Sequence, residues 1–259
     1  MIPAQMIEYL SPPAQVSMAD RWFEIASIEH FWIKRRFDVL RRLAGELVCN
    51  AHEIAEFGCG HGLLQRQIEN VYGRAVTGFD LNEFALQKNL SQFSKVCCYD
   101  IYQKDQALRG RFDLLLLFDV LEHIAEEGRF LSALLYHLAP AGKLIVNVPA
   151  GQWAYSAYDE AAGHVRRYSI RSLRDSTRRN GLKIVNWTYW GFPLLPPLIL
   201  RKVWVLGSHG DDEIIVTGFD SRSNMINRLL GFLSKCERIP QALGGSSLMA
   251  IFEIDGSSY

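Results

Sequence analysis

The sequence predicts a doubly wound α/β domain, in which helices cover both faces of a largely parallel β-sheet. From about residue 51 onward, short apolar runs alternate with segments of helical periodicity. The runs are continuously apolar, which is typical of strands that are buried on both faces. Seven runs predict strands: EIAEFG, RAVTGFD, KVCCYD, FDLLLLFDV, GKLIVNVPA, LKIVNWTYW and SLMAIFEI.

Helical periodicity, with apolar residues at spacings of three and four, covers much of the remaining chain. It occurs in four stretches: 17–47, 63–72, 83–90 and 126–138. The last two predicted strands are separated by roughly fifty-five residues, which is longer than an ordinary connection. We therefore divide the chain into an N-terminal tail and helical cap, residues 1–50, and a main domain, residues 51–259. Within the main domain, residues 191–243 are predicted to be an insertion that serves as a lid or a substrate-binding segment.

Charge and cysteine content narrow the classes of partner and compartment. Lys plus Arg and Asp plus Glu both number 28, so there is no net charge to attract nucleic acid, which we do not expect as a partner. Five cysteines without a CxxC pair predict neither a disulfide framework nor a structural zinc site, and favour the cytoplasm. The most apolar stretch, 190–207, contains three prolines and an Arg-Lys pair. We expect no membrane span there, but a peripheral contact with a membrane is compatible with this composition.

The stretch EIAEFGCGHGLL runs a predicted strand into three glycines, Gly58, Gly60 and Gly62. Glycines let a ligand approach the backbone, and the helix that follows offers N–H groups at its N-terminus. The spacing departs from the G-x-G-x-x-G of dinucleotide sites, and the Gly-Lys-Ser/Thr of a phosphate loop is absent. Glu56, two residues before the first glycine, would repel a pyrophosphate and attract the ammonium group of S-adenosylmethionine. Asp80, about twenty residues further on, can accept hydrogen bonds from the ribose of that ligand.

These motifs resemble, in order and spacing, those of class I S-adenosylmethionine-dependent methyltransferases. EFGCGHG is similar to the first motif of that family, GFDLN to the second, CYDI to the third, FDLLLLFDVLEHI to the fourth and LAPAGKLIVNVPA to the fifth. The resemblance covers about residues 53–150. It implies a seven-stranded Rossmann-like sheet, with SLMAIFEI as a last strand inserted antiparallel beside its neighbour.

The resemblance also implies the cofactor, S-adenosylmethionine, and the positions that contact it. Asp80 would bind the ribose hydroxyls, Asp100 would lie near the adenine amino group, and Ile101 would lie beside the adenine ring. Ordinary capping of strand ends is the alternative role for both aspartates. The cofactor-binding residues expected in this way are Glu56, Gly58, Cys59, Gly60, Gly62, Asp80, Leu81, Asp100, Ile101, Asp119 and Val120.

His123, in DVLEHI, is one candidate for a general base, because the unperturbed pKa of histidine is near neutrality. If a helical turn begins here, Asp119, Glu122 and His123 fall on one side of it. A purely supporting role for Glu122 and His123 is the alternative. A small group of RNA 2′-O-methyltransferases binds a divalent ion through a similar cluster, with His164 as the distant ligand here. We expect no metal.

The second candidate base is His164, in the segment Tyr158 to Leu173. Its pattern D-x-x-x-G-H-x-R-R-Y resembles a broad subgroup of bacterial class I methyltransferases, many of them in surface-polysaccharide or secondary-metabolite pathways. Arg166 and Arg167 would grip a carboxylate or phosphate of the substrate, and Tyr168 would line the pocket. Pairing of these arginines with neighbouring acids is the alternative.

The EHFWIKRR of the first helical stretch resembles the same subgroup, and His30 and Trp32 are predicted to close the pocket. An aromatic stripe that belongs to the core is the alternative. We therefore predict S-adenosylmethionine-dependent methyl transfer, to an oxygen of a small molecule or of a saccharide- or lipid-linked intermediate, by a monomer or homodimer. The alternatives are an NAD(P)-dependent Rossmann oxidoreductase and a catalytically silent S-adenosylmethionine-binding partner protein.

Overall fold

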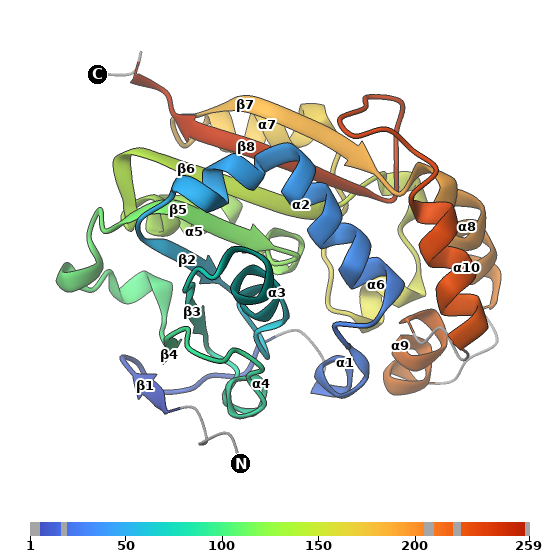
Figure 1. Cartoon of the computed structure of the whole chain (residues 1–259), viewed down its shortest axis with the longest axis horizontal. Helices are drawn as coiled ribbons and strands as arrows, with labels where there is room; N and C mark the ends of the chain where they lie inside the picture. Colours follow the sequence, from blue (N-terminus) through green and yellow to red (C-terminus); the bar gives the residue numbers. More distant parts are fainter. Residues whose placement is uncertain (1–5, 17–19, 205–209, 220–223, 257–259) are drawn as a thin grey trace.

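The centre of the molecule is an eight-stranded sheet with strand order β1-β4-β3-β2-β5-β6-β8-β7 (Figure 1). The computed structural model describes residues 6–16, 20–204, 210–219 and 224–256. The strands are β1 (Ile7–Tyr9), β2 (Ile54–Phe57), β3 (Thr77–Asp80), β4 (Val96–Cys98), β5 (Phe112–Phe118), β6 (Leu138–Pro149), β7 (Leu182–Trp190) and β8 (Ser247–Ile254). Among these strands, every pairing is parallel except those of β8, which lies antiparallel between β6 and β7.

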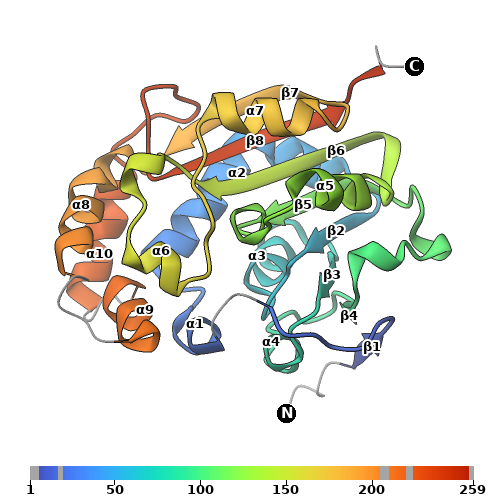
Figure 2. The same ribbon diagram turned by 180° about the vertical axis from the view of Figure 1, so that it is seen from behind.

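Helices cover both faces of the sheet. In Figure 1, α2 and α3 lie in front of it, and in Figure 2 the opposite face carries α5 and α7. The main helices are α1 (Asp20–Ile25), α2 (Phe31–Asn50), α3 (Leu63–Tyr72), α4 (Glu83–Gln87), α5 (Glu127–Leu135), α6 (Ala157–Ala161), α7 (Ile170–Arg178), α8 (Leu195–Trp204), α9 (Asp211–Phe219) and α10 (Asn224–Ser234). None of the described helices is long and apolar enough to cross a membrane.

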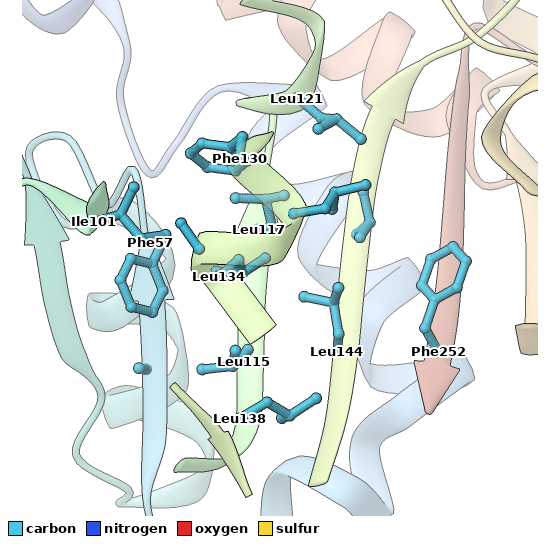
Figure 3. Packing of buried hydrophobic residues seen from close by; sticks show 14 of the residues in the cluster. Phe57, Ile101, Leu115, Leu117, Leu121, Phe130, Leu134, Leu138, Leu144 and Phe252 are labelled. Atoms are coloured by element: carbon cyan, nitrogen blue, oxygen red, sulfur yellow. The ribbon is translucent and has the colours of Figure 1, made fainter. Parts of the chain in front are cut away.

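Strand β5, with the sequence FDLLLLF, shows why residues 114–118 form a continuous apolar run. Leu115 and Leu117 point into the core beneath α5, where they join Phe130 (Figure 3). Leu114 and Leu116 point to the opposite face and pack in the core beneath α2. Because successive strand residues face opposite sides, a strand covered by helices on both faces is apolar along most of its length. Asp113, near the start of β5, instead accepts hydrogen bonds from the backbone N–H groups of His52 and Glu53.

The predicted fold class is confirmed, with one strand more than the seven expected. The additional strand, β1, pairs in parallel with β4 at the edge of the sheet. Three residues are too few to show a periodic pattern, so this strand could not be predicted from the sequence. Strands β7 and β8 and helix α3 have the bounds that the sequence predicted, and the antiparallel last strand is confirmed.

The helical stretch predicted over 17–47 forms two helices, α1 and α2. Its first three residues, 17–19, lie outside the described residues. The break falls at His30, whose Nδ1 atom accepts a hydrogen bond from the backbone N–H of Trp32 over 3.3 Å. His30 is thus the N-cap of α2. A side chain that satisfies the first helical N–H groups favours a helix start at this position over continuation from α1.

The insertion consists mainly of α8, α9 and α10, which lie at the end of the molecule away from β1 (Figure 1). Helix α10 packs against α2, and α9 packs against α6 and α1. The amide of Asn227 in α10 fixes the first contact, because it accepts from Phe31 N over 2.8 Å and donates to Glu29 O over 3.1 Å.

Candidate active site

The glycine loop leaves β2 in a conformation that favours glycine. Gly58, Gly60 and Gly62 have φ angles of +76°, +52° and +78°, which L side chains rarely adopt. A Cβ atom at Gly58 would lie 2.3 Å from a methyl group of Val120, so the loop also passes close to the end of β5. The backbone N–H of Gly60 donates to Oδ2 of Asp80 over 2.7 Å, which ties the loop to the end of β3.

A cavity of about 970 Å³ lies over this loop, at the carboxyl ends of the strands. Open α/β sheets bind their ligands at this edge. Of the residues predicted from the sequence, the cavity is lined by Glu56, Gly58, Cys59, Gly60, Asp80, Asp119, Val120, His123, His164, Arg167, His30 and Trp32. Other predicted residues are not part of its wall: Gly62, Leu81, Asp100, Ile101, Arg166 and Tyr168.

Glu56 is a buried carboxyl group at the floor of the cavity. Burial raises its pKa to about 8; the guanidinium of Arg36 opposes this shift, while Asp80 and Asp119 add to it. The Oε2 atom of Glu56 is buried and has no hydrogen-bond partner among the described residues. A buried acceptor without a donor is costly, so this position is suited to a ligand that brings a cationic donor.

Arg36, on α2, is a site residue that the sequence did not identify. It forms an ion pair with Asp119, and its guanidinium lies 5.2 Å from the ring centroid of Trp32. Its Nε atom is buried and has no hydrogen-bond partner in the described part of the chain, and the residue lines the cavity. Trp32 and Arg36 lie four residues apart, on one face of α2. The predicted role of Trp32 in closing the pocket was therefore the sequence signal that could have placed Arg36 at the site.

Asp119 follows β5 with a φ angle of +57°, unusual for a residue other than glycine. Its Oδ1 atom accepts from the Asn147 amide over 2.7 Å, and its backbone N–H donates to the Asn147 carbonyl over 2.9 Å. Asn147 accepts in turn from the indole N–H of Trp190 over 2.9 Å. Asp119 is therefore fixed by the next strand and by α2, and it does not join Glu122 and His123 on a common helical side.

His164 is oriented by a buried carboxylate. Its Nδ1 atom lies 2.8 Å from Oδ1 of Asp159, which also receives Nε of Arg167 over 2.8 Å. Burial raises the pKa of Asp159, but the His164 hydrogen bond and the Arg167 charge outweigh it and hold the pKa at about 2. An ionised carboxylate only accepts hydrogen bonds, so His164 carries its proton on Nδ1 and presents the lone pair on Nε2. Arg167 thus pairs with Asp159, which is the alternative role given for the arginines above.

His123 packs edge-on against His164, with ring centroids 4.8 Å apart and an interplanar angle of 83°. Burial, reinforced by His164, lowers the pKa of His123 to about 3, so this ring is neutral near physiological pH. Glu122 is buried beside it, and burial together with Asp119 raises the pKa of its carboxyl group. One ligand atom each of Glu122, His123 and His164 lies within 4.8 Å of the others, so these three residues could hold a metal ion.

Arg166 and Tyr168 do not line the cavity, and both instead bind groups of the segment that follows β5. Arg166 pairs with Glu127 over 2.9 Å and donates to the carbonyl of Ile124 over 3.0 Å. The buried hydroxyl of Tyr168 donates to the Leu121 carbonyl over 3.2 Å and also bonds Glu127. Burial, with the added effect of Glu127, raises the pKa of Tyr168.

Asp100 follows β4, as the third motif predicted. Its carboxylate accepts from Tyr102 N over 2.9 Å, and its own N–H donates to Ser11 Oγ over 2.8 Å. In this structure Asp100 is therefore the N-cap of the short helix Ile101–Gln103, and its place near the adenine amino group stays a prediction.

The insertion and α1 supply cavity residues that carried no motif. They are Trp22, Phe23, Leu194, Pro196, Pro197, Leu198, Leu200, Ile226 and Leu230. Their predominantly apolar character was visible in the sequence, but only the tertiary contacts of α8 and α10 show which of them face the cavity.

The doubly wound sheet, the glycine loop and the acidic strand ends together define a class I S-adenosylmethionine-dependent methyltransferase. A model of the methyltransferase-domain family matches residues 28–186, more than half of the chain, and the protein belongs to this family.

Relatives and solved structures agree with this assignment. A probable S-adenosylmethionine-dependent methyltransferase of Mycobacterium tuberculosis is 29% identical over 140 residues, covering 54% of this chain and 50% of its own. A ubiquinone biosynthesis O-methyltransferase of Nitrobacter winogradskyi is 29% identical over 143 residues, covering 53% of each chain. The chain thus spans about half the length of the curated relatives it matches. A crystal structure of a possible histamine N-methyltransferase from Thermotoga maritima has a TM-score of 0.57 at 16% identity, covering 91% of this chain and 93% of its own.

Proposed function

We propose that this protein transfers a methyl group from S-adenosylmethionine to an oxygen of its acceptor, with His164 as the general base. The observation that carries the proposal is the buried Asp159–His164 pair, joined over 2.8 Å, at the wall of the cavity. When bound, S-adenosylmethionine supplies a methyl group on a sulfonium centre. His164 would take the hydroxyl proton at Nε2 as the acceptor oxygen bonds to the methyl carbon and the carbon–sulfur bond breaks.

The residues at the cavity floor fit this cofactor. Glu56, with its unpartnered buried oxygen, would hold the ammonium group of the methionine part. Arg36, with a buried unpartnered Nε atom, would hold the carboxylate. Asp80 would accept hydrogen bonds from the ribose through the carboxylate that already fixes Gly60.

His123 and Glu122 complete the acceptor side of the proposed site. His123 keeps its ring fixed through Nδ1, which donates to the Gly163 carbonyl over 3.2 Å. Because burial lowers its pKa to about 3, His123 is the weaker base, and we give it a positioning role beside His164. Glu122 is buried, and burial raises the pKa of its carboxyl group. This carboxyl group would form a hydrogen bond with the acceptor hydroxyl.

The acceptor class follows from the rest of the wall. The cavity is also lined by Leu194, Leu198, Leu230 and other apolar side chains of the insertion. This favours an acceptor with a polar reactive end and an apolar remainder, such as a lipid-linked intermediate or an apolar small molecule. The ubiquinone O-methyltransferase named above points to the same kind of acceptor for that relative. Residues 191–243 would act as the lid over this acceptor, and residues 190–207 would touch a membrane without crossing it.

The experiment is a pair of measurements on the purified protein. Calorimetry with S-adenosylhomocysteine and with NADH tests the cofactor, and we expect binding of the first only. Binding of NADH alone would favour the oxidoreductase alternative and contradict the proposal. Methyl transfer to candidate acceptors, with wild type and His164→Ala, then tests the base. A wild-type protein that binds S-adenosylhomocysteine but methylates none of the acceptors would favour the silent partner protein.

Chelation separates a histidine base from a metal at Glu122, His123 and His164. We expect EDTA treatment to leave turnover unchanged, as the predicted absence of a metal requires. If turnover were lost and were restored by added divalent ions, the three residues would be ligands, and His164 would not be the base.

A further inference from the structure

The outer face of α10 is apolar where a surface helix is normally polar. Met225, Leu229 and Phe232 are 77%, 57% and 69% exposed, and their spacing places them on one stripe of the helix. The inner face of the same helix is already occupied, because Asn227 and Gly231 contact the start of α2. The residues of this stripe therefore take no part in packing α10 onto the domain.

This stripe is continuous with the mouth of the cavity. Ile226 and Leu200 line the cavity, yet they are 43% and 49% exposed, which places them at its rim. Beside Leu200, Ile199 on α8 is also about half exposed. Trp153 is 58% exposed, and its carbonyl accepts from Lys202 of α8 over 3.2 Å. Figure 2 shows α8 and α10 at the same end of the molecule.

Basic side chains flank the stripe. Arg228 is exposed on α10 and Lys235 directly after its end, and Lys202 and Arg238 are exposed at the ends of the neighbouring segments. The acid in this part of α10 and the loop after it, Glu237, is turned inward, where it pairs with Arg35 over 3.1 Å. Exposed acids of the insertion, Asp211 and Glu213, are on α9 and not on α10.

We propose that the outer face of α10, with the exposed apolar residues of α8, docks on an anionic phospholipid bilayer and presents the cavity mouth to it. An interfacial helix with an apolar stripe and flanking Lys and Arg residues has this composition. Each basic residue near an anionic surface strengthens binding about fivefold. The inference rests on the proposed function, because it gives an acceptor with an apolar tail a route from the bilayer to His164.

A second copy of the chain is the less suitable occupant. In a symmetric dimer across α10, Arg228 and Lys235 would face the same charges of the partner, which is destabilising. Such a dimer would also cover Ile226 and Leu200 and thereby close the cavity mouth. An anionic surface instead complements the charges and leaves the mouth in contact with lipid.

Flotation of the full chain with vesicles tests the proposal. We expect binding to vesicles of equal parts phosphatidylcholine and phosphatidylglycerol, and much weaker binding to phosphatidylcholine alone. Leu229→Glu and Phe232→Glu should each lower the partition coefficient at least tenfold, whereas Phe93→Glu, at a side chain 54% exposed elsewhere on the surface, should leave it unchanged. Arg228→Gln and Lys235→Gln should each weaken binding about fivefold and reduce its salt dependence.

Three results would overturn the inference: no flotation of the wild type, equal flotation of all variants, or a dimer in solution that Leu229→Glu dissociates. Calorimetry with S-adenosylhomocysteine on the same samples keeps the two proposals separate. Retained cofactor binding without flotation would refute the docking surface alone, and flotation without cofactor binding would refute the proposed function alone. Because the substituted side chains are exposed, circular dichroism should show an unchanged fold.

Discussion

His164 donates its Nδ1 proton to Oδ1 of Asp159 over 2.8 Å, and Arg167 donates to both oxygens of the same carboxylate. Asp159 is fully buried, and the pair holds one tautomer of the histidine against the cavity. We expect His164→Ala to lower turnover by about 10²- to 10⁴-fold, the usual contribution of a general base, with affinity for S-adenosylhomocysteine unchanged. Initial-rate kinetics and calorimetry measure both. His52→Ala, at an exposed histidine outside the cavity, is the matched control, and a turnover loss below threefold in His164→Ala would refute the base.

Arg36 should matter for the cofactor and for the fold. Arg36→Met leaves Asp119 without its buried charge partner, so it should lower the free energy of unfolding by about 3 kcal/mol. It should also weaken S-adenosylhomocysteine binding at least tenfold. Arg42→Met lies on the same helix, and its side chain is 49% exposed, so it should change neither quantity. Equal cofactor affinity of Arg36→Met and wild type would show that Arg36 only supports Asp119.

The raised pKa of Glu56 predicts how stability and binding depend on pH. Between 4.5, the ordinary pKa of glutamate, and about 8, the folded protein without cofactor keeps a proton that the unfolded chain has lost. The unfolded state thus binds fewer protons in this window, so the contribution of Glu56 to stability falls as pH rises. Glu56→Gln should remove this fall and should melt at a higher temperature than wild type near pH 8.

Binding of an ammonium group beside Glu56 should favour its ionised form and release a proton. Calorimetric titration with S-adenosylhomocysteine in two buffers of different ionisation enthalpy, near neutral pH, would measure this release. We expect a fractional proton from wild type and less from Glu56→Gln. The same proton release in both proteins would show that the ammonium group does not reach Glu56.

The glycine loop gives a steric prediction with an internal control. A Cβ atom at Gly58 would meet Val120 Cγ2 at 2.3 Å, whereas one at Gly73 would meet nothing within 4 Å. Both glycines have positive φ angles, +76° and +61°. Gly73→Ala should therefore lower the free energy of unfolding by about 1 kcal/mol, the backbone contribution alone. Gly58→Ala should cost about 2–4 kcal/mol, part of which Val120→Ala restores in the double variant.

Tyr168→Phe separates a substrate role from a supporting role. Loss of the hydroxyl removes a buried donor from the Leu121 carbonyl, while Glu127 keeps Arg166, so thermal denaturation should show about 1–2 kcal/mol lower stability. KM for the acceptor should stay the same, because Tyr168 does not line the cavity. A raised KM with unchanged stability would support the original prediction that Tyr168 contacts substrate.

The sequence predicted the fold well where the signal was local. Strand β7, strand β8 and helix α3 were placed to the residue, because continuous or periodic apolar patterns and adjacent glycines mark them. The cofactor loop was found for the same reason, since its glycines and Glu56 are contiguous. Strand β1 was not predicted, because its three residues are recognisable as a strand only from their pairing with β4.

Site residues that depend on contacts between distant segments were harder to predict. Arg36 reaches the site because α2 packs against the end of β5, a contact between residues 83 positions apart. Arg166 was predicted to bind the substrate because of the sequence pattern around it. In the structure it pairs with Glu127 and does not line the cavity. His164 lies where it does through Asp159, which the sequence offered only as a counter-charge for arginine.

The place of β8 has a consequence for the synthesis of the chain. This strand follows both β6 and β7 in the sequence, yet it lies between them and hydrogen-bonds to both. Until β8 has left the ribosome, β6 and β7 each lack a neighbour and present open strand edges, which are prone to pair with other chains. The edges of β6 and β7 must therefore stay unpaired with other chains until β8, which follows both strands in the sequence, has joined them.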